Sequence, residues 1–156
     1  GAIALAFAKE RPNWQVVAVD ANPIAVSLAA KNSRNLGISN ITVLESDWFS
    51  AVAAQPFDLI ASNPPYIDAA APELKGDGVR HEPRNALVAD DAGMSDINHI
   101  IDGAKAYLRP YGFLLLEHGY DQGETTCKAL AKAGYSAIET LHDYANHDRV
   151  SLAQLA

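Results

Sequence analysis

The sequence of 156 residues is poor in cysteine and in basic residues, and it has no long apolar run. Its one cysteine, Cys127, excludes an intrachain disulfide and a zinc site of several thiolates, and such usage is typical of a reducing compartment. Lys and Arg number 12 against 19 for Asp and Glu, a formal net charge of -7. Broad electrostatic binding of nucleic acid or of an anionic membrane needs the opposite balance. No apolar run approaches the roughly 18 residues of a membrane-spanning helix.

The composition is typical of a single globular domain. Hydrophobic residues make up 49% and charged residues 20%, which excludes a disordered or fibrous chain. A chain of this length can bury one core of ordinary size. The chain begins at Gly1 rather than at a methionine, so we expect it to be a piece of a longer protein.

Short apolar runs alternate with amphipathic segments, which is the pattern of repeated strand–helix units. The strands expected from β-branched and apolar runs cover residues 16–20, 41–44, 58–61, 113–116, 138–144 and 149–155. The helices expected from apolar spacing cover residues 2–8, 22–37, 95–108 and 121–134. This order predicts an α/β fold with a mostly parallel, doubly wound sheet and an antiparallel hairpin at its C-terminal edge.

Helix ends are marked by residues that cap backbone groups. Asn22 is the expected N-cap of the second helix and Gly37 its left-handed C-cap. Ser95 is the expected N-cap of the third helix, and Asp121 with Glu124 forms the expected capping box of the fourth.

Residues 64–94 break the periodic pattern. They hold several prolines and glycines, namely Pro64, Pro65, Pro72, Pro83, Gly76 and Gly78. Long loops within compact domains are uncommon and are usually functional, so this segment is expected to serve the site.

Three residues after the first two strands are suited to an adenosine cofactor, because ligands of open α/β sheets bind beyond the carboxyl ends of the strands. Asp20 can accept two hydrogen bonds from a ribose diol, or it can cap the helix that follows. Asp47 beside Trp48 suits the amino group and the face of adenine, although a tryptophan here can equally belong to the core edge. These features do not separate NAD from S-adenosylmethionine.

A glycine and a proline-rich tetrapeptide complete the candidate site. Gly1 opens the first helix, where backbone can approach a ligand, or it is an ordinary glycine. Asn63-Pro64-Pro65-Tyr66 follows the third strand directly. The two prolines stiffen the chain, so that the Asn63 side-chain oxygen and the Pro64 carbonyl can converge on one NH2 group while Tyr66 lies against its plane. A simple turn is the alternative interpretation of this string.

Together these motifs resemble the HemK/PrmC family of class I S-adenosylmethionine-dependent methyltransferases. The resemblance runs through the segments GAIALA, AVDANPIAVSLAAKN, SDWF, SNPPYI, VRHEPRNALVADDAGM and GFLLLEHGYDQGE. Members of the family methylate the side-chain amide of the glutamine in the Gly-Gly-Gln motif of peptide-chain release factors. The Asn-Pro-Pro-Tyr string is shared with amino methyltransferases of nucleic-acid bases, whereas the segments around Glu82 and Glu117 narrow the resemblance to the protein-glutamine branch.

The resemblance implies a Rossmann-like class I methyltransferase fold, S-adenosylmethionine as cofactor and no metal. It implies cofactor binding by Gly1, Asp20, Asp47, Trp48 and Asn63, and a substrate-amide site formed by Asn63, Pro64, Pro65 and Tyr66. The implied protein is cytoplasmic and monomeric, with release factors as partners and no direct binding of nucleic acid or membrane. The family's first strand and its N-terminal helical domain have no counterpart in residues 1–156, so these residues are expected to form a partial catalytic domain. His81 stands where an aromatic residue is frequent in the family.

Two other functions remain open on the motifs alone. One is methylation of an amino group on a nucleic-acid base, which the acidic charge disfavours. The other is an NAD enzyme or a nucleotide-binding module without catalysis, which has no need of convergent amide acceptors. The five histidines lack metal-ligand spacing. His118 follows a buried strand and could line the pocket, but a surface position or a satisfied position in the core is the favoured interpretation. Cys127 is expected to be a small core residue.

Overall fold

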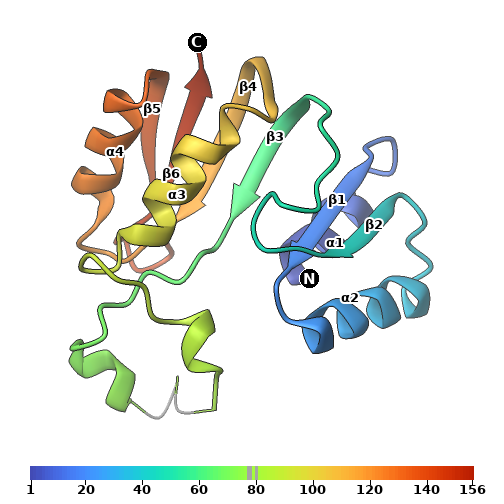
Figure 1. Ribbon diagram of the computed structural model, residues 1–156, viewed down its shortest axis with the longest axis horizontal. Coiled ribbons are helices and arrows are strands. Elements are labelled where there is room, and N and C mark those ends of the chain that lie inside the picture. Colours follow the sequence, from blue (N-terminus) through green and yellow to red (C-terminus); the bar gives the residue numbers. More distant parts are fainter. Residues whose placement is uncertain (77–78, 80) are drawn as a thin grey trace. The chain divides into compact units, whose positions relative to one another are not determined.

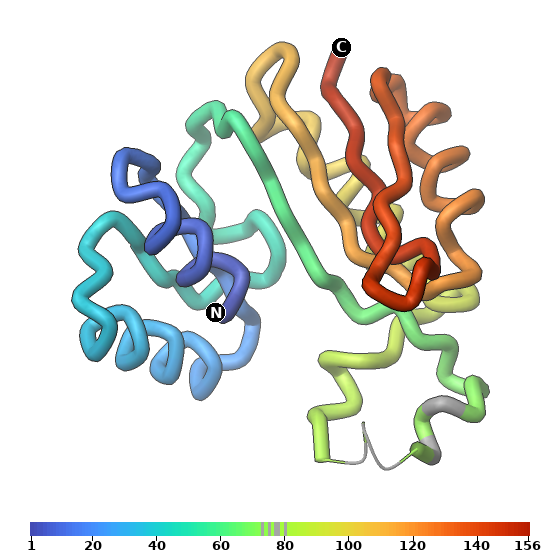
Figure 2. The backbone as a smooth tube through the Cα atoms, turned by 180° about the vertical axis from the view of Figure 1, so that it is seen from behind, coloured from blue at the N-terminus to red at the C-terminus, as the bar shows by residue number. Residues whose placement is uncertain are grey.

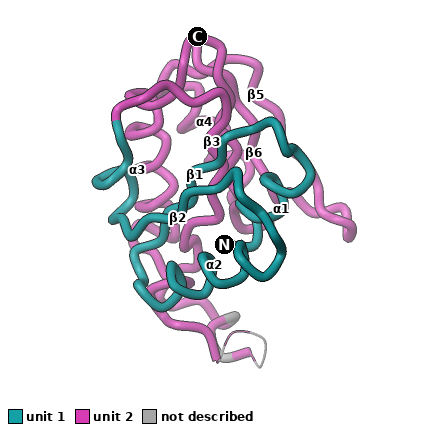
Figure 3. The backbone as a smooth tube through the Cα atoms, turned by 90° about the vertical axis from the view of Figure 1, so that its right-hand side faces the viewer, with its two compact units in different colours: residues 1–53 teal, residues 54–156 magenta. Residues whose placement is uncertain are grey.

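The computed structural model describes residues 1–76, 79 and 81–156, so Gly78 of the expected long loop lies outside the described residues. The chain divides into two compact units, Gly1–Ala53 and Ala54–Ala156, which are coloured separately in Figure 3. They are called unit 1 and unit 2, and each is described by itself. None of the helices that the structure describes is long and apolar enough to cross a membrane.

Unit 1 pairs two parallel strands with two helices. Its elements are α1 (Ala2–Glu10), β1 (Val16–Asp20), α2 (Pro23–Asn35) and β2 (Ile41–Glu45). The register runs from Val16 opposite Ile41 to Asp20 opposite Glu45, so both strands end at the same edge (Figure 1). All four elements lie where the sequence predicts them.

Both ends of α2 have the expected caps. The Asn22 side chain accepts a hydrogen bond of 2.9 Å from the Ile24 N–H, and Pro23 is the first helical residue. Gly37 has a φ of +65°, and the N–H groups of Gly37 and Ile38 donate to carbonyls of the last turn. This pattern is a Schellman motif, which satisfies carbonyls that the helix leaves unpaired.

Unit 2 contains a mixed four-stranded sheet in the order β3-β4-β6-β5. Its elements are β3 (Phe57–Ser62), the 3-10 turns Pro72–Lys75 and Arg84–Ala86, α3 (Ser95–Ala104), β4 (Leu108–Glu117), α4 (Gly123–Lys132), β5 (Tyr135–His142) and β6 (Asp148–Leu155). β3 and β4 are parallel, whereas β6 is antiparallel to both β4 and β5, which confirms the predicted hairpin. α3 and α4 lie against one face of this sheet (Figure 1).

The described strands form two sheets, β1-β2 and β3-β4-β6-β5. Two details differ from the sequence predictions. Leu108 begins β4 instead of ending α3, since it pairs with Phe57. Ser95 and Asp121 are not N-caps: Met94 and Gln122 hold those positions, and neither makes a side-chain cap.

The core of unit 2 forms where α3 and α4 meet the sheet. Its buried side chains include Ile97, Ile100, Ile101, Ala104, Leu114, Leu116, Leu130, Tyr135 and Ala153. Those on α3 follow the predicted helical spacing, so the apolar stripe of α3 is its packing face. The predicted long connection, residues 64–94, joins β3 to α3, and Figure 2 traces its described part, in which Ile67 bridges Val88.

Tyr135 makes the free energy of unfolding depend on pH in alkaline solution. Its side chain is 5% exposed and its hydroxyl donates to the Ile101 carbonyl over 2.9 Å. Burial, with a smaller effect of Asp102, raises the pKa of Tyr135 to about 12. Between pH 10 and 12 the unfolded chain releases this proton and the folded chain keeps it. The free energy of unfolding therefore falls as pH rises, by up to about 1.4 kcal/mol per pH unit.

We expect Tyr135→Phe to remove this dependence. At neutral pH the variant should be less stable by about 1 kcal/mol, because the hydrogen bond to Ile101 is lost. That difference should shrink and then reverse as pH rises above about 10. Urea unfolding of both proteins at neutral pH and at about pH 11 measures it. A difference independent of pH would show that Tyr135 does not titrate differently on folding.

Candidate active site

Asp20 lies at the carboxyl end of β1 with an exposed side chain. Its Oδ1 accepts a hydrogen bond of 2.8 Å from the Asn22 N–H, which fixes the carboxylate at the turn into α2. Among the described residues no hydrogen bond engages Oδ2. The carboxylate therefore supports the helix start, as the simpler interpretation expected, and still has acceptor capacity for a ligand.

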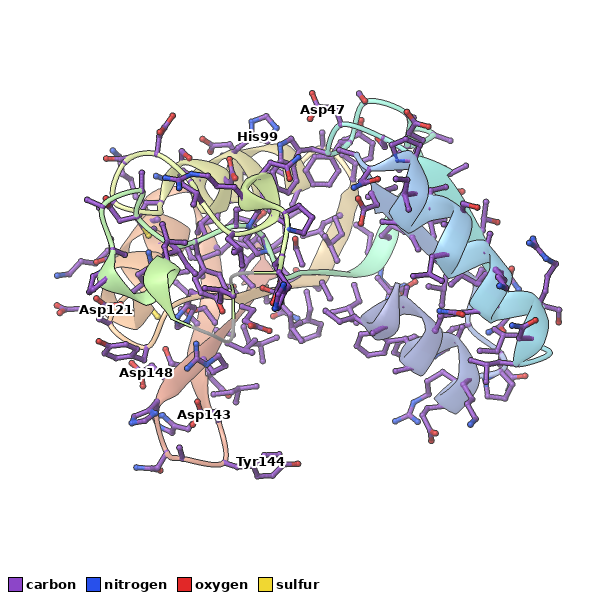
Figure 4. All side chains as sticks on the ribbon, turned by 90° about the horizontal axis from the view of Figure 1, so that it is seen from below. Asp47, His99, Asp121, Asp143, Tyr144 and Asp148 are labelled. Atoms are coloured by element: carbon purple, nitrogen blue, oxygen red, sulfur yellow. The ribbon has the colours of Figure 1, made fainter. Side chains whose placement is uncertain are left out.

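The end of β2 lies beside the end of β1. The Ser46 N–H donates to the Asp20 carbonyl over 3.1 Å, so the two strand ends are joined directly. Asp47 follows with an exposed side chain on the surface of unit 1 (Figure 4). Trp48 is half-buried and has a φ of +48°, a conformation that non-glycine residues rarely adopt, and its carbonyl accepts from the Ser46 hydroxyl. Strain of this kind is common at binding sites.

Gly1 packs against α2. A Cβ atom on Gly1 would lie 2.6 Å from the Cβ of Ala29, closer than real side chains approach. The close approach of α1 and α2 thus already requires a glycine here, and a role of Gly1 toward the cofactor stays a prediction.

Asn63-Pro64-Pro65-Tyr66 emerges from the carboxyl end of β3 in unit 2. Asn63 is exposed and Pro64 is buried, whereas Pro65 and Tyr66 are half-buried. The last pair of the ladder joins Ser62 to Leu116 of β4. Neither the Asn63 carboxamide nor the Pro64 carbonyl has a hydrogen-bond partner among the described residues. Both acceptors of the predicted amide site are therefore without a described protein partner, and of the two residues Asn63 is the exposed one.

The ring of Tyr66 is tied to the neighbouring strands. Its hydroxyl donates to Glu117 Oε1 at the end of β4 over 3.2 Å. Burial and then the Glu117 carboxylate raise the pKa of Tyr66, and Arg149 of β6 lowers it in part. The phenol consequently stays protonated at neutral pH.

Arg149 connects the residue after β4 to the β5–β6 hairpin. Its guanidinium bonds Asp143 Oδ2 over 3.1 Å and the His118 carbonyl over 3.2 Å. Asp143 Oδ1 in turn accepts from the N–H groups of Ala145 and His147, which organises the hairpin turn, and these contacts lower the pKa of Asp143. Figure 4 shows Tyr144 at the tip of this hairpin, pointing outward.

The backbone of Tyr66 is held by residues that the sequence motifs did not single out. Gln122 donates through Nε2 to the Tyr66 carbonyl over 3.0 Å. Gly93, with a φ of +82°, lies so close to Tyr66 that a Cβ atom there would be 2.7 Å from the Tyr66 carbonyl carbon. The signal for Gly93 was the glycine in the ADDAGM segment, whereas nothing local marked Gln122.

His118 is a satisfied core residue, which is one of the roles that the sequence left open. It is fully buried, with Nδ1 2.8 Å from the Gly119 carbonyl and Nε2 3.0 Å from the Ser151 hydroxyl. Nδ1 must carry the proton, and Nε2 accepts from Ser151. Cys127 is half-buried, with Sγ 3.2 Å from Thr140 Oγ1.

The predicted residues thus form two groups. Asp20, Asp47 and Trp48 follow adjacent strand ends in unit 1, with Gly1 on α1 of the same unit. The Asn63–Tyr66 group belongs to unit 2.

Comparison with known proteins identifies relatives of the whole chain. A family model described as "Methyltransferase small domain" matches residues 1–76. The release factor glutamine methyltransferase of Salmonella typhimurium is 55% identical over 151 residues, which is 97% of this chain. The chain is homologous to the release factor glutamine methyltransferases. It spans about half the length of the curated relatives it matches, 54% of the Salmonella protein.

Solved structures support the same fold at lower identity. A methyltransferase from Pyrococcus furiosus is 18% identical with a TM-score of 0.70, over 98% of this chain and 68% of that one. The N-methyltransferase NodS from Bradyrhizobium japonicum, solved with S-adenosyl-l-homocysteine, is 19% identical with a TM-score of 0.60, over 99% and 73%. The chain therefore has the α/β fold of class I methyltransferases.

Proposed function

We propose that residues 1–156 form the catalytic part of a methyltransferase that acts on the side-chain amide of the glutamine in the Gly-Gly-Gln motif of peptide-chain release factors. The observation that carries this proposal is Asn63-Pro64-Pro65-Tyr66 at the carboxyl end of β3, where neither acceptor has a hydrogen-bond partner among the described residues, in a chain 55% identical to such an enzyme. A protein with this substrate acts in the cytoplasm, and we expect it to be a monomer.

The chemistry of an amide explains the residues of the motif. The nitrogen lone pair of an amide is delocalised into its carbonyl, so the nitrogen is a poor nucleophile. Hydrogen bonds from its two N–H groups to Asn63 Oδ1 and to the Pro64 carbonyl fix its orientation. The same oxygens lie where positive charge develops on the nitrogen during methylation, and they stabilise that charge. The proton can leave afterwards, so no strong base is needed beside the motif.

The residues of unit 1 fit an adenosine-containing methyl donor. S-adenosylmethionine, the donor we propose, supplies a methyl group bound to a sulfonium. The Asp20 carboxylate is fixed on one oxygen by Asn22 and can accept the ribose hydroxyls on the other. Asp47 and Trp48 follow the adjacent strand end, where the amino group and ring of adenine would bind. Gly1 and Asn63 complete the proposed cofactor contacts.

Transfer of labelled methyl groups tests the proposal. The protein at its natural full length is incubated with labelled S-adenosylmethionine and one of three substrates. These are a release factor, a variant factor whose Gly-Gly-Gln glutamine is alanine, and duplex DNA. We expect label on the unaltered factor alone. Label on DNA would instead identify an amino methyltransferase of nucleic-acid bases.

Asp20→Asn is expected to weaken binding of S-adenosylhomocysteine roughly 10- to 100-fold, because hydrogen bonds to a charged acceptor are replaced by neutral ones. The carboxamide keeps an oxygen that can accept from Asn22, so the start of α2 should survive. Glu45→Gln is the matched control, because Glu45 is also exposed and lies opposite Asp20 in the register. Isothermal titration calorimetry measures both affinities. Unchanged affinity in Asp20→Asn would limit Asp20 to supporting the helix.

A further inference from the structure

We propose that Gln122 is a positioning residue of the amide-binding site, which holds the backbone after Asn63 and Pro64 in the conformation that their acceptors require. This inference rests on the proposed function and adds to it a residue outside the Asn-Pro-Pro-Tyr motif. Gln122 is half-buried at the start of α4.

The Gln122 carboxamide joins three loops. Its Nε2 donates to the Tyr66 carbonyl over 3.0 Å and to the Ala92 carbonyl over 3.1 Å. Its Oε1 accepts from the Gly119 N–H over 2.8 Å. Both donor hydrogens and the oxygen of one planar group are thereby engaged. The group fixes the segment after β3, the segment before α3 and the turn after β4 relative to one another.

The segment after β3 has little else to hold its backbone. Pro64 and Pro65 have no N–H groups, so they cannot extend the ladder that ends at Ser62. Beyond that pair, the first described backbone hydrogen bond is the one from Gln122 to the Tyr66 carbonyl. The next joins the Ile67 N–H to the Leu87 carbonyl over 2.9 Å. Gln122 therefore supplies the nearest fixed point on the C-terminal side of the two acceptors.

Gly93 leaves room for this arrangement. A Cβ atom at Gly93 would be 2.7 Å from Gln122 Nε2 and 2.7 Å from the Tyr66 carbonyl carbon. Only a residue without a side chain lets the three segments approach this closely. The Tyr66 hydroxyl donates to Glu117, so a displaced Tyr66 backbone would shift the ring relative to the Glu117 carboxylate.

Gln122→Glu tests the inference in the protein at its natural full length. Glutamate keeps the acceptor for Gly119 but loses both donors and places a carboxylate against two carbonyls. We expect kcat for the release factor to fall roughly 10- to 100-fold, because small displacements of reacting groups have effects of this size. KM and the affinity for S-adenosylhomocysteine should stay within about twofold of wild type. Gln154→Glu is the matched control, since its Nε2 donates to the Tyr111 carbonyl over 3.0 Å, outside this cluster.

A second readout does not depend on activity. With 3-fluorotyrosine incorporated throughout and the Tyr66 signal assigned by Tyr66→Phe, the fluorine resonance of Tyr66 should move in Gln122→Glu and stay in Gln154→Glu. If Gln122→Glu does not fold, Gln122→Met provides the same comparison without the added charge. An unmoved Tyr66 resonance, or equal losses of kcat in both glutamine variants, would overturn the inference. Failure of the wild-type protein to methylate the factor would overturn the proposed function, and the fluorine spectra would still decide the role of Gln122.

Discussion

Asn63→Ala should lower kcat for methylation of the release factor by roughly 100- to 1,000-fold. The variant loses one of two acceptors that orient the substrate nitrogen and stabilise its developing charge, and loss of one such group commonly has this effect. Asn63 is exposed and has no partner among the described residues, so its removal should barely change the free energy of unfolding. Steady-state kinetics with the release factor and urea unfolding measure the two quantities.

Asn98→Ala is the control for this prediction. Asn98 lies on α3 in the same unit, where alanine is favourable for the helix. It should retain kcat. If Asn63→Ala also retained kcat within about threefold, the side chain would not be a catalytic acceptor, and the motif would act only as a turn.

Gly93→Ala should lower the free energy of unfolding by roughly 2–5 kcal/mol and should abolish most of the activity. Two effects add. Alanine at a φ of +82° adopts an unfavourable left-handed backbone, and its Cβ would collide with the Tyr66 carbonyl. Relief of that collision requires Tyr66 to move, and the acceptors of Asn63 and Pro64 precede it directly in the chain.

Gly134→Ala separates the two effects. Gly134 has a φ of +94° in the same unit, but nothing lies within 4 Å of the position of an added Cβ. In Gly134→Ala the free energy of unfolding should fall by only roughly 1–2 kcal/mol, the cost of a left-handed backbone for alanine, and kcat should be retained. Equal losses of stability and activity in both variants would mean that the contact of Gly93 with Tyr66 is unimportant.

Much of the fold was predictable because local signals agreed with the tertiary structure. Asn22 and Gly37 mark the two ends of α2, as their capping chemistry predicts. The apolar spacing on α3 identified its buried face. The expectation failed where distant pairing decides the outcome. Leu108 continued a helical spacing, yet it pairs with Phe57 in the sheet.

The candidate site was predictable to the extent that its residues stand in contiguous motifs. Asn63 to Tyr66 and Asp20 follow strand ends, a position that the pattern of apolar runs reveals. Gln122 and Arg149 act across sequence separations of 56 and 31 residues, to Tyr66 and His118. No local pattern marks such pairs, because a glutamine at a helix start and an arginine in a strand have many ordinary uses.

The most direct test of the proposed function is the position of the methyl group on the release factor. After incubation of the full-length protein with S-adenosylmethionine and the factor, tandem mass spectrometry of the Gly-Gly-Gln peptide locates the added mass. We predict one methyl group on the glutamine side chain, and none when the protein carries Asn63→Ala. Methylation at another residue of the factor, or an unmodified Gly-Gly-Gln peptide, would contradict the assignment of Asn63-Pro64-Pro65-Tyr66 as a glutamine-amide site.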